Sequence, residues 1–427
     1  MRLGGRIQAA AEVLEDVLER RTPATMALRD WGKSHRFAGS KDRNAIGNIV
    51  HDALRQKSSI AFRMDSEMPR ALALGAVIFG DLVTLDELLE QTEGDQHFAA
   101  VTPNEIAKLK GQINLDEAPD WVRADVPEWI WPAFENNFTE EAITEGQALA
   151  ARPPLDMRVN TIKAARDDVA KALGFAPTEL SPIGLRVPPI EGNGRHPNVQ
   201  SEPQFMMGEL EIQDEGSQLV SLLVAAQPGD SVLDFCAGGG GKSLALAADM
   251  KGEGEVHAFD IDKRRLAPTY ERAMRAGANN IKVHQPPQDS LSDLIGKMDR
   301  VLIDAPCTGV GTWRRKPDTK WRMTEDALER RVKEQKVVLD AAHQYVRPGG
   351  LLFYVTCSML AEENEQQVYQ FLERQEGFTL LSAGEVWEDR FGVDKPKPWS
   401  EDGLTVTLTP ASTHTDGFFF AVMEKSK

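Results

Sequence analysis

All three cysteines of this 427-residue chain follow apolar runs that have the composition of buried strands. Cys236 follows SVLDF, Cys307 follows RVLIDAP, and Cys357 ends GGLLFYVTC. Ligands bind at the carboxyl edge of open parallel sheets, so we expect the three thiols at that edge. A lone buried cysteine is usually an inert apolar residue, an interpretation we keep for the side chain of Cys236. Cys307 and Cys357 become candidates for thiol chemistry, on adjacent strands facing one crevice.

A glycine-rich turn, CAGGGGKS, opens a predicted helix directly after the SVLDF strand. Counted from Asp234 its spacing is D-x-x-x-G-x-G, and glycines suit a tight turn on which a cofactor lies against bare backbone. A Walker loop would need glycine where Cys236 stands, and the dinucleotide pattern fails because Ser243 or Leu244 occupies its last glycine position. The loop type that remains is the one that binds S-adenosylmethionine.

Two acidic residues stand at the ends of the next two predicted strands. Asp260 ends EVHAFD, where a carboxylate can accept hydrogen bonds from both hydroxyls of a ribose. Asp289 follows NIKVH and is a candidate for the adenine amino group. Strand-end aspartates often only cap a turn or a helix, so the interpretation depends on their order after the glycine loop.

A thiol beside a methyl donor suits methylation of cytosine at C5. That carbon is too electron-poor to accept a methyl group directly, so a nucleophile must first add to C6, and a thiolate does this well. Hydrogen bonding or protonation near N3 assists the addition, which is a task for a desolvated acid such as Asp304 in the DAPC string. The C5 proton must then leave before the thiolate is expelled, and a second thiol can assist that step.

The elements that would position these residues fall into three segments. Residues 1–140 are predicted to form an all-helical domain, because Ile7, Ala11, Leu14 and Leu18 share one helix face and no strand alternation follows. Residues 141–225 combine strand-like LDMRVNT and GLRVP with a helix between them. Residues 226–427 alternate short apolar strands with helices, including one over 327–346, which predicts a mostly parallel sheet covered on both faces.

Composition limits the remaining classes. The chain carries a net charge of −17, yet residues 1–70 and 313–336 each carry a net +4, which permits RNA binding without showing it. Three cysteines form no disulfide framework, and the CxxC and HExxH motifs are absent, so we expect no metal. The apolar stretch 71–80 is too short for a membrane span, and acids near the N-terminus do not suit a signal peptide. We expect a cytoplasmic protein, by default a monomer.

Several strings together resemble a known family. CAGGGGKS, DAPCTGVGTWRRKPDTKWR, RPGGLLFYVTCSMLAEENEQQV and DGFFFAV resemble, in this order, the signature motifs of the RsmB/Nol/Nop/Sun family of RNA 5-methylcytosine methyltransferases. RPPLDMRVNT and IQDEGSQLV resemble its RRM-like element and the junction to the catalytic sheet, and FAGSKDRNAIGNIVHDALRQK resembles the NusB-type RNA-binding domain of the bacterial RsmB branch. The resemblance implies a class I methyltransferase with a Rossmann-like sheet, preceded by these two elements.

The resemblance also implies roles for individual residues. It makes Cys357 in T-C-S the nucleophile, Cys307 in P-C the thiol that assists product release, and Asp304 a neighbour of both target base and cofactor. The implied cofactor contacts are Cys236, Ala237, Gly238, Gly239, Gly240, Gly241, Lys242, Asp260, Asp289 and Asp304. The family loop C-A-A-P-G-G-K has lost its proline here, which makes the turn more flexible and puts cofactor affinity in doubt.

Spacing alone leaves the attacking cysteine open. DNA cytosine-5 methyltransferases use the cysteine of a P-C motif, which would favour Cys307. Those enzymes carry Gln after the cysteine where this chain has Thr308, and T-C-S belongs to the RNA family, so we assign the attack to Cys357.

Basic and aromatic residues alternate directly after the DAPC strand, in a pattern that suits phosphate contacts and base stacking. The resemblance implies that Arg315 and Lys320 lie near RNA, and we add Trp321 and Arg322; the alternative is a loop of packed tryptophans.

The expected function is therefore methylation of a cytosine in RNA, and analogy with the RsmB branch indicates 16S ribosomal RNA. Three alternatives stay open: a transfer RNA methyltransferase, a catalytically silent RNA-binding assembly factor, and a methyltransferase for a small molecule or protein. The intact cysteines count against the second alternative. A methyltransferase for a small molecule or protein needs neither a thiol pair nor a NusB-like domain.

Overall fold

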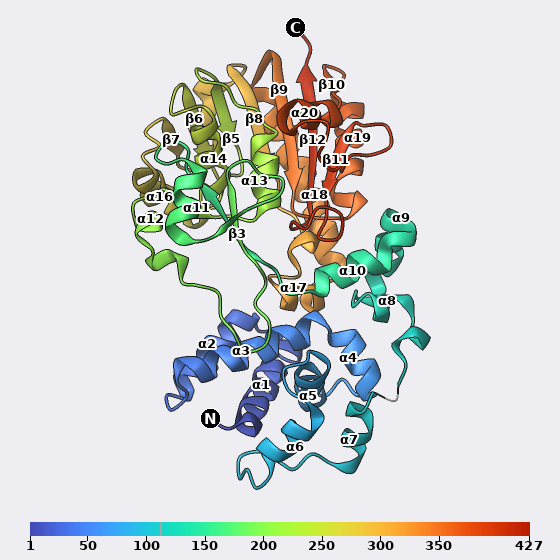
Figure 1. The fold of residues 1–427 in the computed structure, drawn as a ribbon. Coiled ribbons are helices and arrows are strands. Elements are labelled where there is room, and N and C mark those ends of the chain that lie inside the picture. Colours follow the sequence, from blue (N-terminus) through green and yellow to red (C-terminus); the bar gives the residue numbers. More distant parts are fainter. Residues whose placement is uncertain (112) are drawn as a thin grey trace. The chain divides into compact units, whose positions relative to one another are not determined.

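The computed structural model describes residues 1–111 and 113–427, and these form two compact units. The first, here called the helical unit, comprises Met1–Pro153, Pro189–His196 and Trp313–Thr324. The second, the sheet unit, comprises Pro154–Pro188, Pro197–Thr312 and Glu325–Lys427. The chain thus leaves the sheet unit twice and returns to it, and residues 313–324 pack as part of the helical unit (Figure 1).

The helical unit is built around α1, α3 and α5, whose apolar faces form one core. Small residues let these helices approach closely; a side chain at Gly75, for example, would collide with Ile60. The helices of this unit are α1 (Leu3–Leu18), α2 (Ala24–Ser34), α3 (Ser40–Arg55), α4 (Lys57–Met64), α5 (Pro69–Phe79), α6 (Leu85–Thr92), α7 (Pro103–Leu109), α8 (Asp120–Arg123), α9 (Trp131–Phe138), α10 (Ala142–Ala150) and α17 (Pro317–Arg322).

A small antiparallel sheet opens the sheet unit, with strand order β2-β3-β1-β4. Val169 of the helix α11 packs with strand residues such as Met157 and Leu185 in a separate core. The elements are β1 (Leu155–Val159), α11 (Arg166–Leu173), β2 (Ala176–Pro177), β3 (Gly184–Val187), α12 (Pro203–Met206) and β4 (Leu210–Ile212).

The large sheet has the order β10-β12-β9-β8-β5-β6-β7, with β11 paired to β12. Strands β9, β8, β5, β6 and β7 run parallel, whereas β12 and β10 are antiparallel to their neighbours. Its strands are β5 (Ser231–Asp234), β6 (Glu255–Phe259), β7 (Ile281–His284), β8 (Met298–Asp304), β9 (Val346–Thr356), β10 (Phe378–Leu380), β11 (Thr405–Leu408) and β12 (Phe418–Lys425).

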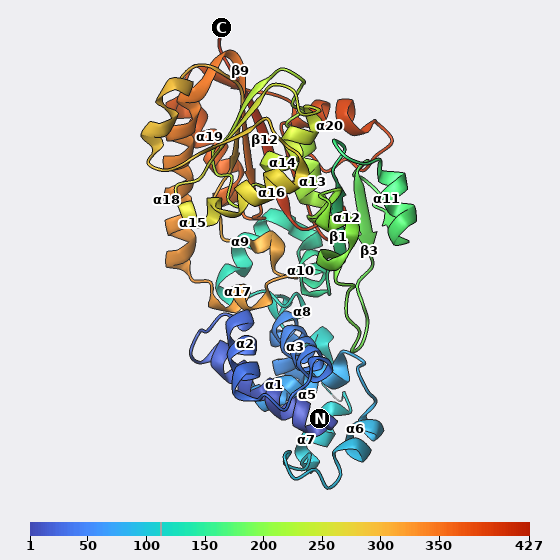
Figure 2. The same ribbon diagram turned by 90° about the vertical axis from the view of Figure 1, so that its left-hand side faces the viewer.

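Helices cover both faces of this sheet because successive strand residues alternate between two cores. On β9, Phe353 and Val355 join the core beneath α13 (Glu215–Leu222), α14 (Gly241–Asp249), α16 (Pro268–Ala276) and α20 (Ala383–Phe391). Leu352 and Tyr354 join the opposite core beneath α18 (Glu325–Ala342) and α19 (Glu365–Arg374). Figure 2 shows the sheet between these helix layers, and α15 (Lys263–Leu266) follows β6.

The fold predicted from the sequence is confirmed: a mostly parallel Rossmann-like sheet with helices on both faces, accompanied by an all-helical part and a small α/β element. One boundary was wrong, because the helix expected to reach residue 346 ends at Ala342, and Val346 already begins β9. The division into domains 1–140, 141–225 and 226–427 stays a prediction, as does the likeness of the helical part to NusB. Among the described residues, no helix is long and apolar enough to cross a membrane.

Candidate active site

The carboxyl ends of three neighbouring parallel strands bring the predicted catalytic residues together. Asp304 at the end of β8 lies beside Val355 of β9, and Asp234 at the end of β5 lies beside Leu302 of β8. Cys357 follows β9 directly, and Cys307 lies three residues beyond Asp304. This edge therefore holds both candidate thiols and the candidate acid.

The sulfur atoms of Cys307 and Cys357 are 3.3 Å apart, within hydrogen-bond range. The bond to Cys357 raises the pKa of the Cys307 thiol well above its ordinary value, and enclosure of the side chain adds to this. Cys307 therefore keeps its proton at neutral pH, and its sulfur lies close enough to Cys357 to share a hydrogen bond with it.

The turn that carries Cys357 is fixed by Asn364. The Thr356 hydroxyl donates to Asn364 Oδ1 over 2.6 Å, and Asn364 Nδ2 donates to the Ser358 carbonyl over 3.1 Å. All three residues are buried, and buried polar groups are stable only when they are hydrogen-bonded. The T-C-S turn is thus held on both sides of the cysteine.

Glu363 holds the loop that carries Cys307. The backbone N–H of Thr308 donates to Oε1 of Glu363 over 2.8 Å, and the Thr308 hydroxyl donates to Oε2 over 2.5 Å. Gln335 of α18 donates a third hydrogen bond over 3.0 Å and binds the Pro306 carbonyl with the same amide nitrogen. Glu363 is fully buried, and burial raises the pKa of its carboxyl. Sequence reasoning missed this residue, although the acidic run after T-C-S was a signal.

Lys242 pairs with Asp304, its Nζ lying 2.7 Å from Oδ2. Burial alone would lower the pKa of this ammonium, but the Asp304 carboxylate and the Cys357 sulfur raise it above its ordinary value. Burial also raises the pKa of Asp234 to about 7, and the Ser243 hydroxyl donates to it over 2.6 Å.

A cavity of about 590 Å³ opens beside this edge. Asp260 lines the cavity, and Ile261 and Val337 form an apolar part of its wall. Pro306, which precedes Cys307, also lines it. The other lining residues are Phe235, Cys236, Phe259, Arg265, Gln288, Arg331, Lys333, Glu334, Val338 and Ala341. A carboxylate for ribose hydroxyls beside apolar walls for an adenine ring fits an adenosine cofactor.

The glycine loop lies against the same carboxylate. Gly238 N donates to Asp260 Oδ2 over 2.9 Å, and Asp262 N donates to Oδ1 over 2.8 Å. Gly240 has a positive φ of 79°, and a Cβ there would lie 2.6 Å from the Thr269 side chain, so this position requires glycine. These bonds orient the Asp260 carboxylate for a ribose.

Of the predicted cofactor contacts, Cys236 and Asp260 line the cavity, and Asp289 does not. Asp289 is exposed and does not line the cavity, whereas its neighbour Gln288 does. Val337 and Ile261, which the sequence analysis did not single out, form the apolar wall. Contact of Asp289 with adenine stays a prediction.

The predicted RNA-binding segment packs within the helical unit. Lys320 is 1% exposed, and its Nζ donates to the carbonyl of Arg55, the last residue of α3. Trp321 Nε1 donates to the Leu54 carbonyl over 2.5 Å. Both side chains thus cap helix-end carbonyls that have no partner within the helix. The expected RNA contact of Lys320 does not fit its burial, while contact by Arg315, Trp321 and Arg322 stays a prediction.

Comparisons with known proteins find relatives over nearly the whole chain. The family model described as 16S rRNA methyltransferase RsmB/F matches residues 221–424. The chain is 33% identical to ribosomal RNA small subunit methyltransferase B of Citrobacter koseri, covering 97% of this chain and 98% of the relative. The protein of that name from Escherichia coli (strain 536) is 31% identical, with 97% of each covered. The solved structure of a methyltransferase homolog from Pyrococcus horikoshii is 26% identical, covers 73% of this chain and 100% of its own, and has a TM-score of 0.60.

Proposed function

The chain belongs to the RsmB/F family of 16S rRNA methyltransferases, and from this premise we propose that it methylates C5 of a cytosine in 16S ribosomal RNA through a covalent cysteine adduct. It is an RNA methyltransferase, and its cofactor is S-adenosylmethionine. The observation that carries the proposal is the pair of sulfur atoms 3.3 Å apart, joined through Pro306 to the cavity that contains Asp260.

The first step is attack of Cys357 on C6 of the base. The attacking form is the thiolate, which a free thiol reaches only to a few per cent at neutral pH, and the Cys307 sulfur lies 3.3 Å from the attacking atom. The new S–C6 bond moves electron density to C5. Bound S-adenosylmethionine supplies the electrophilic methyl group that C5 then takes.

Asp304 has the task of holding the polar edge of the cytosine. Its side chain is a third exposed, so a base can reach it, while Lys242 behind it holds the carboxylate in place. In this position Asp304 accepts a hydrogen bond from the amino group N4, and a proton shared within the Lys242–Asp304 pair is available to N3 as charge develops on the ring.

Product release requires loss of the C5 proton to solvent and cleavage of the S–C6 bond. The Cys307 thiol donates its hydrogen bond to the departing Cys357 sulfur, which makes that sulfur a better leaving group. Electrons from the C5–H bond re-form the C5–C6 double bond, and Cys357 returns to its starting state. Cys307 thereby acts late and Cys357 early.

Covalent trapping on RNA that contains 5-azacytidine at the target tests these roles. The wild-type chain and Cys307→Ala should form an adduct that survives denaturing electrophoresis, and Cys357→Ala should not. An adduct with Cys357→Ala but not with Cys307→Ala would reverse the assignment. Bisulfite sequencing of total RNA from a deletion strain and its parent identifies the target, and a missing mark in transfer RNA alone would refute ribosomal RNA as substrate.

A further inference from the structure

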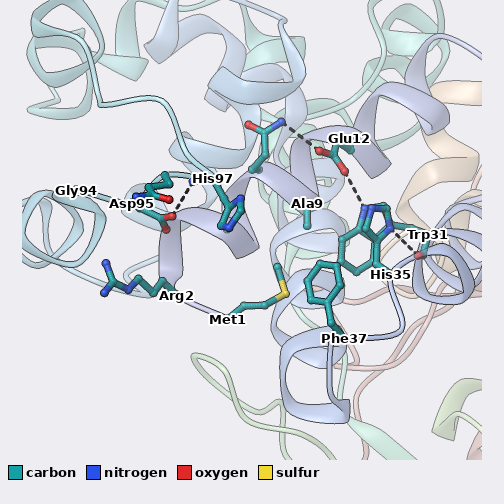
Figure 3. A pocket seen from close by; sticks show the side chains of 13 residues that line it. Met1, Arg2, Ala9, Glu12, Trp31, His35, Phe37, Gly94, Asp95 and His97 are labelled. Atoms are coloured by element: carbon teal, nitrogen blue, oxygen red, sulfur yellow. Dashed lines mark hydrogen bonds between the residues drawn. The ribbon is translucent and has the colours of Figure 1, made fainter.

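The helical unit contains a second cavity, of about 550 Å³, that the methylation chemistry does not use. It lies between α1, the loop that follows α2 and the turn that follows α6. Figure 3 shows Glu12, Trp31, His35, Phe37 and His97 around it. We propose that this cavity binds an unpaired guanine base of the RNA substrate.

Three aromatic rings line the cavity: Trp31 and His35 stack on each other, and the exposed ring of Phe37 stands perpendicular to His35. The rings of Trp31 and His35 are parallel, with centroids 4.2 Å apart and an interplanar angle of 14°. Phe37 meets the edge of His35 at 5.8 Å and is 73% exposed, an unusual state for a phenylalanine. RNA-binding proteins use such exposed rings to stack on bases that have left a helix.

Hydrogen bonds hold the rings of Trp31 and His35 in place. Trp31 Nε1 donates to Oε2 of Glu12 over 2.9 Å, and His35 Nδ1 lies 2.9 Å from the Trp31 carbonyl. These two rings therefore lose little conformational entropy when a base stacks on them.

Glu12 supplies the group that discriminates among bases. Its carboxylate is exposed and is oriented by Trp31 and by Gln8, which donates to Oε1 over 3.3 Å. A carboxylate only accepts hydrogen bonds, and each oxygen has more than one lone pair. Guanine alone presents two adjacent donors, N1–H and N2–H₂, whereas cytosine and adenine pair a donor with an acceptor that a carboxylate repels.

The surroundings favour a nucleotide over an apolar peptide. Arg2 lines the cavity, Arg36 precedes Phe37 and is exposed, and residues 1–70 carry a net charge of +4. Cations suit the phosphates on either side of a base. The inference rests on the RNA substrate of the proposed function but not on which carbon is methylated.

Binding of short RNA to the full-length chain tests the proposal. The probes are fluorescein-labelled hexaribonucleotides UUUGUU and UUUCUU, measured by fluorescence anisotropy at fixed salt. We expect the guanine probe to bind at least fivefold more tightly. Phe37→Ala should weaken its binding about five- to tenfold, which corresponds to the lower part of the range for loss of one stacking ring, whereas Phe37→Trp should retain it.

Matched variants separate stacking from base recognition. Glu12→Gln should remove the preference between the two probes, and Trp129→Ala, which removes another exposed aromatic side chain of the helical unit, should change neither affinity. Thermal melting checks that each variant is folded. Equal binding of both probes by the wild-type chain, or equal loss in Phe37→Ala and Trp129→Ala, would overturn the proposal.

The test also separates this inference from the chemistry of methylation. Cys357→Ala should bind the guanine hexamer as the wild-type chain does while forming no adduct. Phe37→Ala should raise KM for ribosomal RNA with little change in kcat. A lower kcat for Phe37→Ala without a change in its affinity for the guanine probe would contradict a base-binding cavity.

Discussion

Removal of the Glu363 carboxylate should show whether the two cysteines depend on a fixed loop. Glu363→Ala leaves the Thr308 N–H and one amide hydrogen of Gln335 without their acceptor in a buried place. Each orphaned donor costs about 1–3 kcal/mol, so we expect the free energy of unfolding to fall by about 3–4 kcal/mol. If about 3 kcal/mol of this also held the loop for reaction, methyl transfer would slow about 150-fold.

Glu363→Gln provides the matched control. Its Oε1 can still accept from Thr308 N–H and Gln335, and its amide nitrogen can donate to the Thr308 hydroxyl, which rotates to accept. We expect a change in unfolding free energy within about 1 kcal/mol at neutral pH. The Glu363 charge is one cause of the raised Cys307 pKa, so this variant should lower that pKa.

The pH dependence gives a further check on the same residue. Burial raises the folded-state pKa of Glu363, so its stability contribution is fully present below the ordinary value near 4.5 and is lost as pH rises through the folded value. Glu363→Gln has no such loss and should gain stability relative to wild type as pH rises. Urea unfolding at several pH values measures this, and methyl transfer from tritiated cofactor measures activity. Activity of Glu363→Ala within threefold of wild type would refute the reasoning.

Three other changes test separate parts of the site. Cys307→Ala should transfer methyl groups in a single turnover but accumulate the RNA adduct, seen as a slowly migrating band in denaturing gels; fast multiple turnover would contradict its late role. Asp260→Asn should weaken binding of S-adenosylhomocysteine about 10- to 100-fold by calorimetry, because a charge-assisted hydrogen bond contributes about 1.5–3 kcal/mol, and RNA affinity should stay unchanged. Burial lowers the pKa of Lys320 to about 8, so its buried charge destabilises the fold at pH 7 and less at pH 10. Between these pH values wild type should gain about 2–3 kcal/mol relative to Lys320→Met in urea unfolding, and equal pH dependence of the two chains would show that folding does not lower the pKa of Lys320.

The strands of the large sheet were predicted well because each is marked by residues that are neighbours in the sequence. Short apolar runs mark these strands, and the structure confirms β5, β6, β8, β9 and β12 in the predicted places. Segment 313–324 illustrates the limit of that approach. Its alternating cations and aromatic residues suit RNA and a protein interior equally well, and only the packing of Lys320 against the end of α3 distinguishes the two.

Glu363 and the cavity around Phe37 show the same limit within single sites. A glutamate in an acidic run is usually a solvated residue, and only the fold buries this one beneath Thr308 and Gln335. Trp31, Phe37 and Glu12 come from separate segments, and their common cavity depends on how those segments pack. No periodic pattern in the sequence marks either site.

The sequence by itself determined which chemistry is available. Cys357 in T-C-S, Cys307 in P-C and the glycine loop before Lys242 predict a thiol-dependent methyltransferase, because residue types and their positions after strands are properties of the chain. The tertiary structure decided that the two thiols meet. Their separation of 3.3 Å and the raised pKa of Cys307 depend on side chains that meet only when β8 and β9 pair. Charge and burial act through space, so no spacing along the chain could have supplied them.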